Sequence, residues 1–89
     1  MNWRLTFSRN AQKSLRRLQA EARRRLDGAI AEMERDPLAG DVVLLKDYPV
    51  GYRRRVGPYR ILFDIDRATH SVQIQDIERR TSTSYRRRS

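Results

Sequence analysis

Alternating apolar and charged residues in the middle of the chain predict a two-stranded hairpin. The alternation covers residues 52–65 and is interrupted by Gly57 and Pro58, a pair typical of a tight turn. With these two residues as the loop, Arg55 lies opposite Arg60 on the neighbouring strand. Like charges in such positions destabilise a sheet. This pairing has two possible explanations. Either an anionic ligand covers the two arginines, or they lie on an ordinary solvated outer face of the sheet.

The two faces of this hairpin differ in polarity. The face expected to join the core carries Tyr52, Val56, Tyr59, Ile61, Phe63 and Ile65. The opposite, open face carries Arg53, Arg55 and Arg60. Residues 72–77 predict the next strand, and strict alternation along it puts Ile77 and Arg79 on the open face. Arg79 should then lie near Arg60, so the pattern predicts a cluster of guanidinium groups.

The N-terminal part of the chain predicts one strand followed by helices. Residues 2–7 alternate in polarity, as in a strand with one buried face. Ser8 is a favourable helix N-cap, and apolar residues at helical spacing follow it between residues 11 and 33. They predict a helix pair, or one long bent helix, that ends at Asp36-Pro37, because the residue before proline disfavours helical angles. The apolar residues 42–45 predict a short strand or a segment docked on the core.

We therefore predict an α+β fold in which two N-terminal α-helices pack on one face of a small antiparallel β-sheet. Residues 1–80 form a single domain, since a chain of 89 residues suffices for one hydrophobic core. Residues 81–89 form a basic C-terminal tail that carries Tyr85 and is too polar to fold alone. No apolar run of membrane-spanning length and no signal-peptide pattern is visible, so we expect a cytoplasmic protein.

The net charge of the chain indicates what kinds of molecule it binds. The chain has 20 Lys plus Arg against 11 Asp plus Glu, a net charge of +9, and its lysines are Lys13 and Lys46. The remaining positive charge is arginine, whose planar guanidinium binds phosphate through two hydrogen bonds and stays protonated. A nucleic acid, an acidic protein, or both are the expected partners. Membrane binding is not expected.

The residue types exclude most kinds of catalytic site. The chain has no cysteine, and its one histidine, His70, lies in a predicted turn, so we expect neither a metal site nor nucleophilic catalysis through a thiolate or a serine–histidine pair. No glycine-rich phosphate loop is present. Arginine can stabilise the charge that builds on phosphate during phosphoryl transfer. A tyrosine near positive charge can exchange a proton with a ribose hydroxyl. These residues fit a metal-free ribonuclease or a plain RNA-binding surface.

The chain resembles the RelE/ParE superfamily of bacterial toxins from type II toxin–antitoxin systems over nearly its full length. The resemblance rests mainly on residues 51–63 (GYRRRVGPYRILF) and on Ile77-Glu78-Arg79 followed by Tyr85. It implies a compact antiparallel sheet packed by two N-terminal helices. Relatives in the ribonuclease branch have lysines where this chain has arginines on the first strand of the hairpin, and many have histidine at the position of Glu78.

The resemblance implies a toxin that cleaves messenger RNA on the ribosome and inhibits translation, without a cofactor. Its implied catalytic residues are Arg53, Arg55, Arg60, Arg79 and Tyr85, with Arg80 as a further RNA-binding residue. Arg60 and Arg79 would bind the scissile phosphate and its transition state. The two arginines of the preceding strand would position the RNA backbone and stabilise the leaving 5′-oxygen, and Tyr85 would transfer protons.

Two other functions fit the same residues. One is a ParE-like inhibitor of DNA gyrase that shares the fold and cuts nothing itself, and the other is a non-catalytic nucleic-acid-binding module. For either toxin, the resemblance implies a cognate antitoxin, with an acidic or amphipathic segment that wraps the helices and covers the arginines. It also implies a role in plasmid stabilisation. The sequence leaves open the antitoxin's identity, the cleavage-site preference and the general base.

Overall fold

The computed structural model of the protein describes residues 2–79. These residues form two helices and five strands. Their bounds are β1 Arg4–Phe7, α1 Arg9–Arg16, α2 Ala20–Arg35, β2 Asp41–Leu44, β3 Tyr52–Val56, β4 Tyr59–Asp66 and β5 Ser71–Arg79. This order confirms the predicted α+β fold, and the apolar connector forms the strand β2. Neither helix in this part of the chain is long and apolar enough to cross a membrane.

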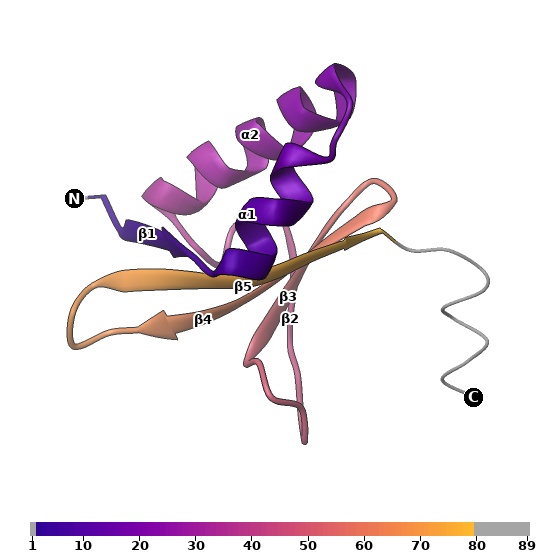
Figure 1. Ribbon diagram of the computed structural model, residues 1–89. Helices are drawn as coiled ribbons and strands as arrows, with labels where there is room; N and C mark the ends of the chain where they lie inside the picture. The colour runs from indigo at the N-terminus through magenta and orange to yellow at the C-terminus, as the bar shows by residue number, and fades with distance from the viewer. Residues whose placement is uncertain (1, 80–89) are drawn as a thin grey trace.

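All five strands belong to one sheet with the order β1-β5-β4-β3-β2. Neighbouring strands run antiparallel except β1, which is parallel to β5. Parallel neighbours need a long crossover connection, and here both helices and the strands β2 to β4 lie between them in the sequence. Both helices cover the same face of the sheet, which leaves the other face open (Figure 1).

Local sequence sets the bounds of the helices. The Ser8 hydroxyl accepts a hydrogen bond of 3.0 Å from the Ala11 N–H and caps α1, as predicted. The helices are separate, since three residues lie between Arg16 and Ala20. Their apolar stripes meet the sheet in one core. Its largest fully buried side chains are Phe63, Leu26, Met33, Ile61, Ile74 and Val72.

A β-bulge in β5 changes the face on which this strand's last residues lie. Leu62 pairs with Asp76 and Phe63 with Ile74, so Gln75 is an extra residue between them. An extra residue shifts the alternation by one position. Ile77 therefore lies opposite Ile61 in the core, where it is 5% exposed, and Arg79 lies opposite Tyr59. The expectation that Ile77 and Arg79 share the open face with Arg60 was wrong, because strict alternation does not allow for the bulge.

Arg54 is buried between the sheet and α2. Its guanidinium donates to the Ala29 carbonyl oxygen at 3.4 Å and forms an ion pair with Glu32. The hydrogen bond from Arg54, together with its positive charge, lowers the pKa of the Glu32 carboxyl. Because Arg54 points to the helices, its neighbours Arg53 and Arg55 point to the open face. Arg54 thus fixes the direction of the whole arginine run on β3.

Candidate nucleic-acid interface

The open face carries one cross-strand row of four charged residues. Asp41 pairs with Arg55, Arg55 with Arg60, and Arg60 with Glu78, so that the signs run negative, positive, positive, negative. Glu78 accepts a hydrogen bond of 3.1 Å from Arg60, whereas Arg55 and Asp41 lie 3.9 Å apart. The predicted pairing of Arg55 with Arg60 is confirmed. Flanking carboxylates offset part of its repulsion.

Arg53 differs from its two neighbours on this face. It is half-buried, and its Nε atom is enclosed without a hydrogen-bond partner. Within residues 2–79, the Arg53 guanidinium forms no ion pair. Its cross-strand partners are the apolar Val43 and Leu62. Arg53 therefore offers the positive group on the open face that is least neutralised by the described part of the protein.

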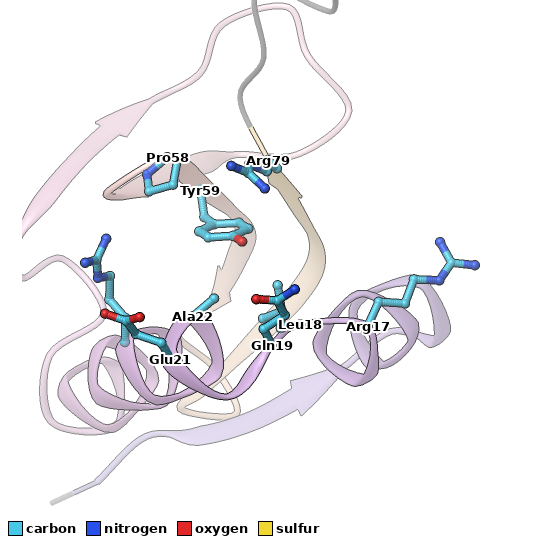
Figure 2. Close-up of a pocket in the computed structure, with 9 residues that line it drawn as sticks. Arg17, Leu18, Gln19, Glu21, Ala22, Pro58, Tyr59 and Arg79 are labelled. Carbon is cyan, nitrogen blue, oxygen red and sulfur yellow. The ribbon is translucent and has the colours of Figure 1, made fainter.

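Arg79 lies on the helix side of the sheet, in a separate cleft. Its guanidinium carbon is 5.9 Å from the centre of the Tyr59 ring, a cation–π contact. Both residues line a cleft of about 460 Å³ between the hairpin and the start of α2. Figure 2 shows Tyr59 and Arg79 on one side of this cleft and Gln19 and Ala22 on the other. Arg17 and Arg25 also line the cleft, which makes it basic.

The structure therefore divides the predicted site residues. It brings Arg53, Arg55 and Arg60 together on the open face and places Arg79 on the opposite side. Tyr85 and Arg80 lie outside the described residues. The sequence interpretation missed the carboxylates Asp41 and Glu78 in the charged row. Strand pairing could have identified Glu78, but only if the bulge had been included, because the bulge brings Glu78 opposite Arg60.

The metal-ligating residue types do not gather anywhere in residues 2–79. No group of three His, Cys, Asp or Glu side chains in this range could hold a metal ion. His70 stacks on Trp3, with the ring centres 3.8 Å apart, and its Nε2 atom is buried. Its ring therefore serves to cover Trp3 at the turn between β4 and β5. The chemistry available on the open face is that of guanidinium and carboxylate groups.

Comparison with known protein families identifies the family of this protein. Residues 5–82 match the family model for the ParE toxin of the type II toxin–antitoxin system parDE. The chain belongs to this family. It is thus the toxin component of a type II toxin–antitoxin system, and the resemblance to the RelE/ParE superfamily is confirmed. A search of curated protein sequences finds no significant match.

Solved structures with the same fold come from several organisms. The RelE–RelB complex of Pyrococcus horikoshii OT3 has 24% identity and a TM-score of 0.78, and covers 90% of this toxin and 97% of that chain. The Mycobacterium tuberculosis RelBE2 complex has 23% identity and a TM-score of 0.76, with coverages of 90% and 100%. The isolated Escherichia coli RelE toxin has 19% identity and a TM-score of 0.76, with coverages of 98% and 99%. At these identities the similarity establishes the fold.

Proposed function

We propose that this toxin is a metal-free endoribonuclease that cleaves messenger RNA on the ribosome. The observation that carries the proposal is the gathering of Arg53, Arg55 and Arg60 on the open face. Three guanidinium groups there lie on two hydrogen-bonded strands, and the Nε atoms of Arg53 and Arg60 are enclosed without partners. Rigid strands preorganise these charges for a phosphate whose negative charge increases during reaction.

The chemistry follows from the residue types. In RNA, the ribose 2′-oxygen can attack the adjacent phosphorus and expel the 5′-oxygen, leaving a cyclic phosphate and a 5′-hydroxyl. Arg60 would bind the scissile phosphate, while Arg53 and Arg55 would hold the backbone and stabilise the leaving oxygen. Arginine stays protonated and cannot act as the base. Tyr85, Arg79 and Arg80 belong to this proposal through the family resemblance.

The test is cleavage of messenger RNA bound to purified ribosomes. Arg60→Ala should reduce cleavage by about 10²–10³, the loss typical for one transition-state-stabilising donor. Arg79→Ala and Tyr85→Phe should also reduce it. The matched control is Arg24→Ala, which removes an exposed charge from α2 and should leave cleavage unchanged. Wild-type cleavage by a protein that carries all three active-site substitutions would contradict the proposal.

Inhibition of DNA gyrase is the second candidate, and the match to the ParE family model favours it. The position of Arg79 also fits it, since this arginine lies apart from the open face. A gyrase inhibitor would leave messenger RNA intact and cause gyrase–DNA complexes to accumulate. Plasmid supercoiling by purified gyrase, measured with and without the toxin, separates this candidate from the ribonuclease.

A cognate antitoxin is the partner that we propose for either activity. Two of the solved structures named above, from Pyrococcus horikoshii OT3 and Mycobacterium tuberculosis, are toxin–antitoxin complexes. The toxin's charge of +9 favours an acidic or amphipathic segment that wraps the helices and covers the arginines. A cytoplasmic location and a role in plasmid stabilisation belong to the same proposal. Co-expression with the adjacent reading frame, followed by purification in rising salt, tests the complex.

A further inference from the structure

Glu78 is the carboxylate that the bulge in β5 brings directly opposite Arg60. Its Oε1 atom accepts a hydrogen bond of 3.1 Å from Arg60 Nη2, and its side chain is 32% exposed against 20% for Arg60. Within residues 2–79, this is the one side-chain hydrogen bond of Glu78. The Arg60 guanidinium therefore anchors the carboxylate while one of its oxygens faces no protein donor in the described region.

The other carboxylates on this face are engaged differently. Asp64 uses both oxygens, accepting from the Gly51 N–H at 2.7 Å and from the Gln75 amide at 3.3 Å. Asp76 accepts from the N–H of the next residue at 2.8 Å and lies opposite Leu62 rather than an arginine. Asp41 is at the sheet edge, 3.9 Å from Arg55. Among the interactions of residues 2–79, only those of Glu78 combine an anchoring hydrogen bond from a half-buried arginine with an unengaged oxygen.

We infer that Glu78 is the general base of the proposed ribonuclease reaction, an inference that rests on that proposed function. Arg60 has five N–H donors, of which Glu78 uses one. The Arg60 Nε atom is enclosed, so the donors left for a phosphate are those of the two terminal nitrogens. A phosphate bound there would lie beside the carboxylate, and a base must lie within hydrogen-bond reach of the proton it removes.

The step balances as a simple transesterification. Glu78 Oε2 takes the proton of the 2′-hydroxyl, and the 2′-oxygen forms a bond to phosphorus. The bond between phosphorus and the 5′-oxygen breaks, and the leaving oxygen takes a proton from water. No oxidant, metal or further reactant is needed. The products are a 2′,3′-cyclic phosphate and a 5′-hydroxyl, and the enzyme regains its original protonation by exchange with water.

A different role for Glu78 makes opposite predictions. If it only neutralises Arg60, it competes with the phosphate, and its removal should strengthen RNA binding and speed cleavage. If it is the base, its removal should slow the chemical step and leave binding nearly unchanged. The pH dependence separates the two roles further, because only a base sets the acidic limb of the rate profile.

The experiment measures single-turnover cleavage of messenger RNA on ribosomes at saturating toxin, across the pH range in which ribosomes stay intact. Glu78→Gln keeps the size of the side chain and should slow cleavage by about 10²–10⁴. Binding of an RNA with a 2′-deoxy sugar at the cleavage site should change by less than about threefold. Glu78→His should restore part of the activity and change the pH dependence of the rate, because an imidazole and a carboxyl group titrate in different ranges.

Asp41→Asn is the matched control, since Asp41 occupies the same row and faces the other arginine. Its cleavage rate should stay within about threefold of wild type. Thermal melts of all three variants verify that they fold. Equal or faster cleavage by Glu78→Gln, with an unchanged pH profile, would overturn the role of Glu78 and leave the ribonuclease proposal standing. A wild-type protein that cleaves no RNA would overturn both.

Discussion

The buried Arg54 allows a quantitative test of how α2 is held against the sheet. Its side chain is 9% exposed, while that of its partner Glu32 is 51% exposed. Replacing a buried ion pair with apolar side chains is often neutral, whereas removing one partner is costly. Because Glu32 is half exposed and can regain water when Arg54 is replaced, we expect the stability of the protein to depend on the volume that Arg54 fills more than on its charge.

The expected magnitudes follow from this geometry. Arg54→Ala removes two methylenes, each worth about 0.8 kcal/mol when buried, together with the guanidinium, and leaves a cavity under α2. Because Glu32 is half exposed and can regain water, we expect a total loss of about 2–4 kcal/mol. Arg54→Met fills most of the same volume and should cost less than about 1.5 kcal/mol. Glu32→Gln leaves the buried guanidinium with a neutral acceptor and should lower the stability less than Arg54→Ala does.

The assay is equilibrium unfolding in urea, followed by the fluorescence of the single tryptophan, Trp3, which stacks on His70. The midpoint and slope of each transition give the free energy of unfolding. The matched control is Arg24→Ala, which replaces an exposed arginine on α2. Equal losses for Arg54→Ala and Arg54→Met would refute the reasoning, because charge rather than filled volume would then stabilise this contact.

Three further predictions use single substitutions. We expect Arg53→Ala to weaken the salt dependence of RNA binding. The slope of the logarithm of the binding constant against the logarithm of the salt concentration should become less negative by about 0.7, the value for one phosphate contact to single-stranded RNA. An unchanged slope would mean that Arg53 does not contact phosphate. Arg54 lowers the pKa of the Glu32 carboxyl in the folded protein. The ionised pair therefore stabilises the fold fully at pH values above the unfolded-state pKa of about 4.3. This stabilisation is lost as the pH falls through the pKa of Glu32 in the folded protein. Glu32→Gln should flatten this acidic part of the urea-midpoint profile. Gly40→Ala should cost about 1–3 kcal/mol in urea unfolding, because Gly40 has φ +82° and an added Cβ would lie 2.9 Å from the Arg54 guanidinium carbon.

The helices and the hairpin could be predicted because short-range signals determine them. Ser8 as an N-cap, the stop before Pro37 and the turn at Gly57-Pro58 all act within a few residues. The register of the hairpin followed from the turn, and the pairing of Arg55 with Arg60 was therefore correct. The parallel pairing of β1 with β5 depends on contacts between distant segments, so no local pattern revealed it.

The candidate site was only partly predictable for the same physical reason. Alternation identified Arg53 and Arg60 on the open face, since both lie on strands without interruption. The bulge at Gln75 has no clear sequence signal, because neither glycine nor proline marks it. Everything beyond it was therefore assigned to the wrong face, which placed Arg79 among the open-face arginines and concealed Glu78. Glu78, the proposed base, lies opposite Arg60 only because of this bulge.

The most direct test of the central claim is mapping of RNA ends in cells after the toxin is induced. If the toxin is a ribonuclease, new ends should arise inside translated messages, with a 5′-hydroxyl on one fragment and a 2′,3′-cyclic phosphate on the other. Arg60→Ala should abolish these ends at equal protein level. Intact messages, together with accumulated gyrase–DNA complexes, would contradict the ribonuclease assignment and support gyrase inhibition instead.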